Sequence, residues 1–384
     1  MVLILALPLM SVSQVLGGAF RGTLDIRPGI VAQMLIQPWT RILVIIALFM
    51  LGWRLKAVLW GTVFSFAVST SFLVYQAQRS LFPGNVLRPS PQGLFNNILE
   101  VTRYSIVLSL SLSVAQLLSR TDILMLAYFV PSAETGRYAV VQMVTGVIPL
   151  FNTAFSQLLG PEIAGAYAQG DLREVMTLAR RHVRWVTITS LPVFLALAVF
   201  GDGLIALFGQ KFSSPCPNLP RVILLLASSN LVGAVFSSTG FMLSMTGRHT
   251  REFAALLITL VCNVTINYFL IPLYGIVGAA LSTFLSTCIG NFLRLSLIRV
   301  SFRLLPIGKD IFLPVAVGLL SIGPFAILKH AVSPHPRFFT AFLLSVFFIL
   351  TYAVPISKYC LSGVERALVV RLADHLRTHL PKRN

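Results

Sequence analysis

Two charged side chains lie deep inside a long apolar segment near the middle of the chain. Arg120 and Asp122 fall within residues 104–130, about 10 residues or ~15 Å from the end of that segment if it is helical. A charge at the centre of a bilayer costs roughly 2.5–3.5 kcal/mol on insertion scales, so a charge kept there is a candidate functional group. A guanidinium binds phosphate through two parallel hydrogen bonds. Both side chains are equally suited to bonding neighbouring helices, and at two residues apart they need not pair with each other.

Amide side chains recur at helical spacing inside other apolar segments. Asn263 and Asn267 are four residues apart and therefore share one face of a helix. Such groups bind sugars, yet they also hold membrane helices together. Both roles stay open for the candidate substrate-binding residues, which are Arg120, Asp122, Asn152, Gln157, Asn230, Asn263 and Asn267.

The composition shows what must position these residues. Of the 384 residues 56% are hydrophobic and 11% are charged, against about 25% charged in soluble domains. A soluble globule needs a polar surface that this composition cannot supply. Lipid offers no hydrogen bonds to the backbone, so helices are favoured because they satisfy their own backbone groups. The alternation of polar and apolar residues that is typical of membrane barrel strands is absent. We predict an all-α, polytopic transmembrane helical bundle of about eleven spans, near 1–20, 38–53, 57–78, 104–130, 137–160, 184–208, 220–245, 252–271, 274–298, 310–329 and 338–357.

The basic residues predict the orientation of the chain. There are 30 Lys and Arg against 12 Asp and Glu, and the basic residues form short clusters between the spans. This scatter is typical of cytoplasmic loops and argues against nucleic acid as a partner. Counted on alternate sides, the bias is roughly threefold, which predicts a cytoplasmic C-terminus and places Met1 at the outer face. The cytoplasmic segments 21–37, 80–103 and 161–183 are interpreted as interfacial helices, and the cluster Arg180–Arg184 as an anchor to lipid headgroups.

Metal, cofactor and catalytic chemistry receive no support from the sequence. We predict that all six histidines lie in loops or the tail, and the four cysteines show no CxxC spacing. No glycine-rich phosphate loop, nucleophile elbow or paired carboxylates are visible. The expectation is therefore a protein that is not an enzyme, without catalytic residues, metal or cofactor.

Three stretches resemble the polysaccharide transporter family of the multidrug/oligosaccharidyl-lipid/polysaccharide exporter superfamily. The clearest is Asn267–Ala280, in which Pro272 is predicted to end one span and G-x-x-G-A-A opens the next. Gly275, Gly278, Ala279 and Ser282 would form a small face for close helix approach. The others are Arg120–Phe129 followed by Glu134–Tyr138, and Gly160-Pro161-Glu162 followed by a basic amphipathic helix.

The resemblance implies a fold with two six-helix lobes plus two helices, as in the multidrug exporters of the same superfamily. Residues 104–300 would be the complete C-terminal lobe, and 1–80 the remaining half of an incomplete N-terminal lobe. Residues 81–103 would be a cytoplasmic interfacial linker, and 301–384 two extra helices with a basic tail. On this alignment the family's first three helices are lacking. A faint likeness of Ser11–Gly18 to Ser228–Ala234 supports the register.

The family's function would be to flip undecaprenyl-diphosphate-linked oligosaccharide across the cell inner membrane for lipopolysaccharide or O-antigen synthesis. Its partners would be that lipid-linked oligosaccharide, membrane lipids and a coupling ion, H+ or Na+, with Arg120 meeting the pyrophosphate. Three alternatives stay open: a multidrug/cation antiporter of the same superfamily, a membrane glycan polymerase or ligase, and an inactive truncated flippase. Asp122 is the one acid convincingly inside a span, which disfavours the antiporter, and the short outer loops disfavour the enzyme.

Overall fold

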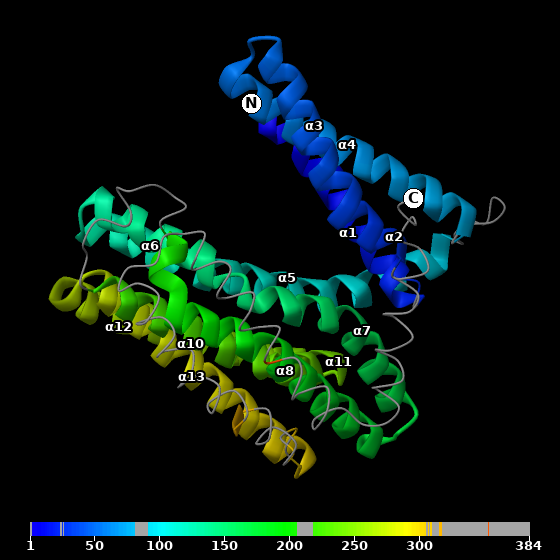
Figure 1. Cartoon of the computed structure of the whole chain (residues 1–384). Helices are drawn as coiled ribbons and strands as arrows, with labels where there is room; N and C mark the ends of the chain where they lie inside the picture. The colour runs from blue at the N-terminus through cyan, green and yellow to red at the C-terminus, as the bar shows by residue number, and fades with distance from the viewer. Residues whose placement is uncertain are drawn as a thin grey trace, which may run out of the picture. The chain divides into compact units, whose positions relative to one another are not determined.

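A computed structural model describes residues 2–80 apart from 24 and 26, residues 91–205 and 218–304, and residues 306, 308, 315, 316 and 352. Throughout these ranges the regular structure is helical and contains no strand (Figure 1). The chain divides into two compact units, one comprising Met1–Tyr104 with Gly160–Glu162 and the other comprising Ser105–Leu159 with Ile163–Asn384. Each unit is described by itself.

The first unit is built on three long helices. α1 (Ala6–Gly22) and α3 (Gln37–Met50) both pack against α4 (Arg54–Ser80). α2 (Arg27–Ile30) and the π-helical turns η2 (Val31–Ile36) run without a break into α3, and the short 3-10 helix η1 (Val2–Leu5) leads into α1. The interfacial segment predicted at 21–37 is therefore not separate from the following span. Ser69 fixes this packing by donating its hydroxyl to the carbonyl oxygen of Ala32 at 3.2 Å.

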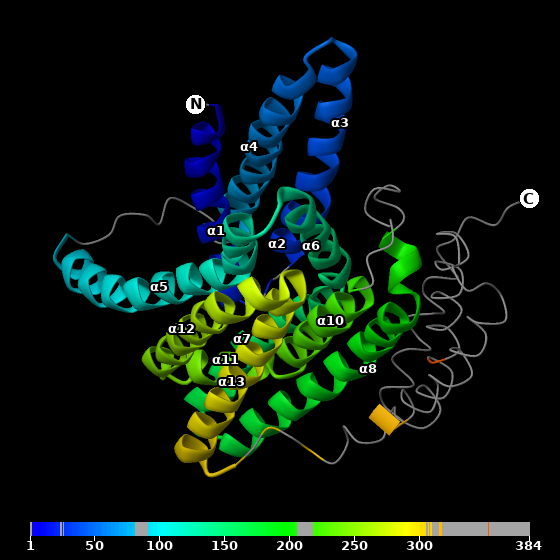
Figure 2. The ribbon, with the colours of Figure 1, turned by 90° about the vertical axis from the view of Figure 1, so that its left-hand side faces the viewer.

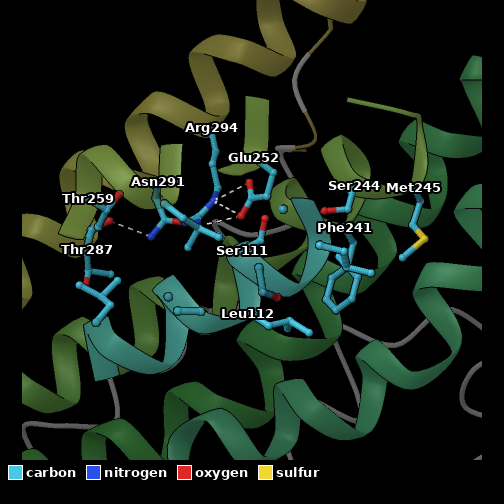
Figure 3. Close-up of a pocket in the computed structure, with 17 residues that line it drawn as sticks. Ser111, Leu112, Phe241, Ser244, Met245, Glu252, Thr259, Thr287, Asn291 and Arg294 are labelled. Carbon is cyan, nitrogen blue, oxygen red and sulfur yellow. Dashed lines mark hydrogen bonds and ion pairs between the residues drawn. The ribbon is translucent and has the colours of Figure 1, made fainter. Parts of the chain in front are cut away.

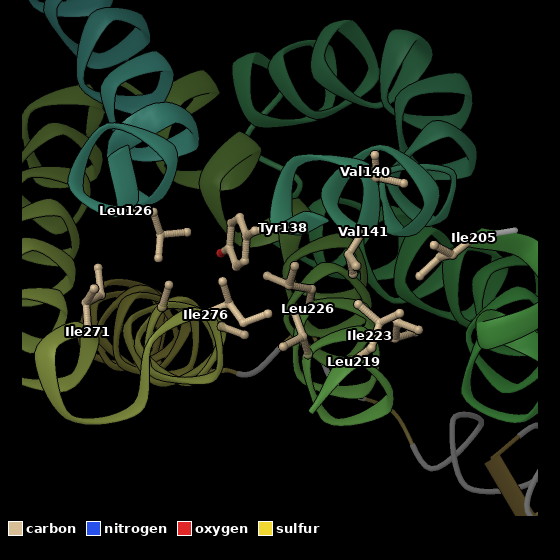
Figure 4. Packing of buried hydrophobic residues seen from close by; sticks show 13 residues of the cluster. Leu126, Tyr138, Val140, Val141, Ile205, Leu219, Ile223, Leu226, Ile271 and Ile276 are labelled. Carbon is tan, nitrogen blue, oxygen red and sulfur yellow. The ribbon is translucent and has the colours of Figure 1, made fainter. Parts of the chain in front are cut away.

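The second unit contains most of the remaining helices. These are α5 (Pro91–Phe129) from Ser105 onward, α6 (Ser132–Thr145), α7 (Ile148–Ala168) apart from Gly160–Glu162, α8 (Leu172–Ile205), α10 (Leu219–Val235), α11 (Ser237–Met245), α12 (His249–Tyr274) and α13 (Ile276–Phe302). α10 lies between α8 and α13, and α13 packs along α12 (Figure 2). Leu126, Tyr138, Leu226 and Ile276 belong to a buried cluster that joins α5, α6, α10 and α13 (Figure 4).

Small residues permit the close packing of α12 and α13. Gly275 joins the two helices alone and has a φ of 57°, a conformation that glycine adopts without a Cβ clash. A Cβ added to Gly278 would overlap the carbonyl oxygen of Leu270. The prediction that Gly278, Ala279 and Ser282 form a close-packing face is confirmed, because all three are buried. The prediction that Pro272 ends the span is wrong: α12 continues to Tyr274, and the proline only removes one donor from its last turn.

Seven helices in the described ranges are long and apolar enough to cross a bilayer. They are Arg27–Met50, Lys56–Ser80, Ser105–Phe129, Leu172–Gly201, Leu219–Met245, His249–Tyr274 and Ile276–Phe302. The spans predicted at 310–329 and 338–357 lie outside the described residues, apart from residues 315, 316 and 352. The one predicted at 137–160 is broken between α6 and α7 at Gly146-Val147. Pro149 contributes to that break, since it has no N–H to bond the carbonyl of Thr145.

Polar and apolar residues are distributed as expected in a bilayer. Asp122 is 2% exposed, whereas Tyr128 on the same helix is 85% exposed and Phe292 on α13 is 70% exposed. Water would penalise such large exposed apolar side chains when they cover whole helices. The polytopic helical membrane fold predicted from composition is confirmed, and its buried polar residues become the candidates for function.

Candidate functional site

The carboxylate of Asp122 is the centre of a buried hydrogen-bond network that joins four helices. Its Oδ2 accepts a 2.9 Å hydrogen bond from the Tyr138 hydroxyl on α6 and a short one from the Thr283 hydroxyl on α13. Its Oδ1 accepts from the side-chain amides of Asn267 at 2.9 Å and Asn263 at 3.3 Å, both on α12. A carboxylate has roughly four acceptor positions, so this coordination fills its capacity.

The two asparagines of α12 also bond each other and α13. Asn267 donates to Asn263 Oδ1 at 3.1 Å, and Asn263 Nδ2 lies 3.2 Å from the Ser286 hydroxyl. Ser282 donates to the backbone carbonyl of Asn263 at 3.0 Å. The small side chains on α13 allow this approach, so the same pattern that packs the helices also assembles the polar cluster.

The network holds one formal negative charge and leaves one acceptor unused. Each of the four side chains that donate to Asp122 is neutral. The Oδ1 atom of Asn267 is buried without a hydrogen-bond partner among the described residues. A buried charge is costly unless it is neutralised or heavily hydrogen-bonded, and a buried unpaired acceptor adds to that cost. The one acceptor that this cluster leaves unused among the described residues is therefore Asn267 Oδ1.

Arg120 is not part of this network. Its side chain is exposed, whereas Asp122 is buried. The sequence prediction that these two residues need not pair agrees with this geometry. The tyrosine and threonine of the network were missed in the sequence analysis. Thr283 could have been identified from the sequence, because it is a polar residue that directly follows Ser282 in the small face of α13.

A second polar chain connects α7, α8 and α11. Asn152 Oδ1 accepts hydrogen bonds from the hydroxyls of Ser156 at 3.0 Å and Ser237 at 2.6 Å, and His182 Nε2 lies 3.2 Å from the Ser156 oxygen. Since the only hydroxyl proton of Ser156 points to Asn152, His182 Nε2 must be the donor in that contact. Asn152 thus lies at a junction of helices.

His182 corrects a prediction. A position in a loop was predicted for this residue, but it lies inside α8 and is 5% exposed. α8 begins at Leu172, well before the span predicted at 184–208, so the cluster Arg180–Arg184 is helical and His182 occupies its buried side. His249 is likewise the first residue of α12 rather than a loop residue. His330, His335, His375 and His379 lie outside the described residues.

The remaining candidates stand apart from both networks. Asn230 is half-buried on α10, and it belongs to neither the Asp122 network nor the Asn152 chain. The side chain of Gln157 lies outside the described part of the structure, although its backbone is in α7. The geometry therefore brings together Asp122, Asn263 and Asn267, and it places Asn152 in a separate contact.

Comparison with known proteins places this fold in a family. Two relatives from Haloferax volcanii are the probable flippase AglR, 25% identical over 54% of this chain and 44% of that protein, and the probable low-salt glycan biosynthesis flippase Agl15, 23% identical over 55% and 44%. The chain thus spans about half the length of these relatives. An uncharacterized membrane protein of Methanocaldococcus jannaschii, MJ1375, is 27% identical over 58% of this chain and 52% of its own.

Two solved structures share the fold at low sequence identity. The lipid II flippase MurJ in an inward closed conformation matches with a TM-score of 0.57 and 13% identity over 87% of this chain and 68% of its own. A single-residue mutant of the Vibrio cholerae MATE transporter VcmN matches with a TM-score of 0.62 and 14% identity over 76% and 66%. Residues 1–217, more than half of the chain, match the family described as polysaccharide biosynthesis protein. The chain therefore belongs to the polysaccharide biosynthesis protein family.

Proposed function

We propose that this protein flips an undecaprenyl-diphosphate-linked oligosaccharide across the cell inner membrane for surface polysaccharide synthesis. The observation that carries the proposal is the family match together with two relatives named as probable flippases. The helical membrane fold suits this task, because its large apolar side chains face outward and its polar ones inward. Transport is favoured over a membrane glycan polymerase or ligase because the two relatives are named as probable flippases.

The Asp122 network is the proposed site of the coupling ion. The four side chains that donate to Asp122 are neutral, so a proton or Na+ that displaced one of these hydrogen bonds would neutralise the buried charge. Binding would rearrange the hydrogen bonds of Asn263, Asn267, Thr283 and Tyr138, which lie on α12, α13 and α6. Ion occupancy would then bias the packing of these helices, as alternating access requires.

The orientation follows the charge bias of the sequence. We propose a cytoplasmic C-terminus, with the α7–α8 turn in the cytoplasm and the α8–α10 connection outside. Arg173, Arg180 and Arg181 near the start of α8 would then face the anionic inner leaflet.

A complementation experiment tests the transport function. The chain is expressed in a bacterial strain that lacks its own oligosaccharide flippase, and surface glycan is measured. Restored glycan supports the proposal. Absence of glycan, with the protein present in the membrane, contradicts it. Resistance to antibiotics without restored glycan would instead indicate the multidrug antiporter.

A further inference from the structure

A cavity of about 410 Å³ lies inside the second unit, apart from the Asp122 network. It is lined by residues of α5, α11, α12 and α13 and by Gly233 of α10, and it is partly open to the outside. Its walls are mostly apolar and include Leu108, Leu112, Phe241 and Leu256. One side is polar, as Figure 3 shows for Arg294, Glu252 and Asn291. A largely apolar cavity with a few convergent polar groups is the usual form of a small-molecule site.

The polar side is dominated by one ion pair. Arg294 on α13 donates its Nε–H to both carboxylate oxygens of Glu252 on α12, at 3.0 Å each, and its Nη2 lies 2.9 Å from Oε1 (Figure 3). The side chains are 16% and 10% exposed. Burying such a pair is weak evidence for stability, because removing two charges from water costs about as much as their attraction returns. Its position in the wall of a cavity favours a role in binding.

Arg294 is suited to exchange one anion for another. A guanidinium fork binds a phosphate with the same two parallel hydrogen bonds that it makes to a carboxylate. Arg294 lines the cavity and retains exposed surface there. A phosphate entering the cavity would therefore compete with Glu252 for the fork.

Glu252 is stabilised by its own helix and packs against a neighbouring one. It lies in the first turn of α12, where the helix dipole stabilises a negative charge. Gly240 of α11 faces its carboxylate, and a Cβ there would lie 3.2 Å from Oε1. The absence of a side chain at position 240 therefore allows the carboxylate to pack closely against α11.

We propose that this cavity binds the phosphate end of a single-chain lipid phosphate, with Arg294 exchanging Glu252 for the phosphate. The charge is complementary to the guanidinium, and the leucine and phenylalanine walls are complementary to a hydrocarbon chain. The volume is near the lower end of ligand pockets, roughly 300–1,000 Å³. It suits a phosphate carrying one chain better than a diacyl phospholipid with a glycerol backbone and two chains. For its natural ligand the inference rests on the proposed function, since a polyprenyl carrier is a lipid of this class.

Photo-crosslinking tests the site directly. The purified chain in phosphatidylcholine nanodiscs is labelled with dodecyl phosphate that carries a diazirine on its chain, and labelled peptides are identified by mass spectrometry. Labels are expected on the cavity walls of α5 and α11. Unlabelled dodecyl phosphate is expected to compete at least about tenfold better than dodecanol, inorganic phosphate or phosphatidylglycerol, because only it has both the charge and the single chain.

Amino-acid substitutions distinguish the contribution of the ion pair to labelling from the contribution of the cavity. Arg294→Gln is expected to lower labelling about tenfold or more, and Glu252→Gln to raise it, because the first removes the fork and the second releases it. Arg299→Gln, an exposed basic residue on the same helix, is the matched control and leaves labelling unchanged. Ser111→Phe is expected to abolish labelling by filling the cavity. The unfolding temperature of each variant shows whether it folds. If Arg294→Gln does not fold, Arg294→Lys replaces it, because lysine keeps the charge without the guanidinium fork. Arg294→Lys is expected to bind dodecyl phosphate more weakly than the wild type.

Three results would overturn the inference. If dodecanol competes as well as dodecyl phosphate, the cavity binds hydrocarbon without regard to charge. If phosphatidylglycerol competes equally well, the cavity is a site for bilayer lipid. If folded Arg294→Gln or Arg294→Lys is labelled as strongly as the wild type, Arg294 does not bind the phosphate. If the chain fails complementation but is labelled as expected, the proposed transport function is contradicted and the proposed lipid-phosphate site is supported. If the chain restores glycan but its labelling does not depend on charge, the transport function is supported and the site is contradicted.

Discussion

The side-chain amide of Asn267 on α12 donates a 2.9 Å hydrogen bond to the carboxylate of Asp122 on α5. The bond joins residues 145 positions apart in the sequence, and it lies where Tyr138 and Thr283 bring α6 and α13 to the same carboxylate. A single buried charge thus connects four helices. Any change of that charge is transmitted to all of them, which makes Asp122 the first residue to test.

Asp122→Asn removes the charge with little change of volume. We expect ion dependence of transport to disappear, and the transport rate to fall about tenfold or more, because hydrogen bonds to a charged group contribute about 1.5–3 kcal/mol. Transport of a fluorescent lipid-linked oligosaccharide in proteoliposomes, with Na+ and proton gradients imposed separately, measures both effects.

The control for this substitution is Glu174→Gln, which neutralises an exposed acid on α8. It is expected to transport as the wild type does. If Asp122→Asn keeps the full response to both gradients, the coupling ion binds elsewhere and the network serves helix packing alone.

Gly278→Ala tests the contact that assembles the network. The added Cβ would overlap the Leu270 carbonyl oxygen, and overpacking of this kind costs about 1–3 kcal/mol. We expect a lower unfolding temperature in detergent. Gly165→Ala on α7 is the matched control, because no atom lies within 4 Å of its added Cβ. It is expected to be neutral or to stabilise by up to about 1 kcal/mol. Equal unfolding temperatures for the two variants would contradict the close packing of α12 and α13.

The fold class and part of the site could be predicted from the sequence. Composition and apolar length determine a helical membrane protein, and the spacing of Asn263 and Asn267 correctly predicted that they share one helix face; their contact with Asp122 was not predicted. Periodicity reports only which residues share a helix face, not which distant helix that face meets. For this reason Tyr138 and Thr283 were missed. Arg120 was also chosen as a candidate because it is a charged residue inside an apolar segment, yet its side chain is exposed.

The ion pair at the cavity also escaped the sequence analysis. Glu252 was placed at the very start of a span and Arg294 was counted among cytoplasmic basic residues. α12 begins at His249 and α13 extends to Phe302, so both side chains lie inside the helical unit. Glu252 and Arg294 both fell within predicted spans, 252–271 and 274–298, but sequence periodicity does not show that they face each other. For His182 the error was one of helix ends, because the predicted span began at 184 and α8 begins at Leu172.

The Asn152 chain is predicted to stabilise helix packing by a small amount. Asn152→Ala removes the acceptor shared by Ser156 and Ser237, and interhelical hydrogen bonds in membranes contribute about 0.6 kcal/mol on average, up to ~1.7. A double-mutant cycle with Ser237→Ala, followed by reversible unfolding in lipid, measures the coupling. Thr153→Ala is the control, since Thr153 is exposed and bonds only its own helix. Strict additivity of Asn152→Ala and Ser237→Ala would contradict the shared contact.

The proposed orientation predicts which side of the membrane reaches each end of α8. In a background without the four native cysteines, Asn218→Cys just before α10 should react with a membrane-impermeant maleimide in intact cells. Gln169→Cys, between α7 and α8, should react only after the cells are permeabilised. Both positions are exposed, so a difference in labelling reports the side of the membrane rather than burial. The physical basis is the excess of basic residues at the start of α8, which is retained on the cytoplasmic side. Labelling of position 169 and not 218 in intact cells would reverse the orientation, and labelling of both would indicate two orientations in the same membrane.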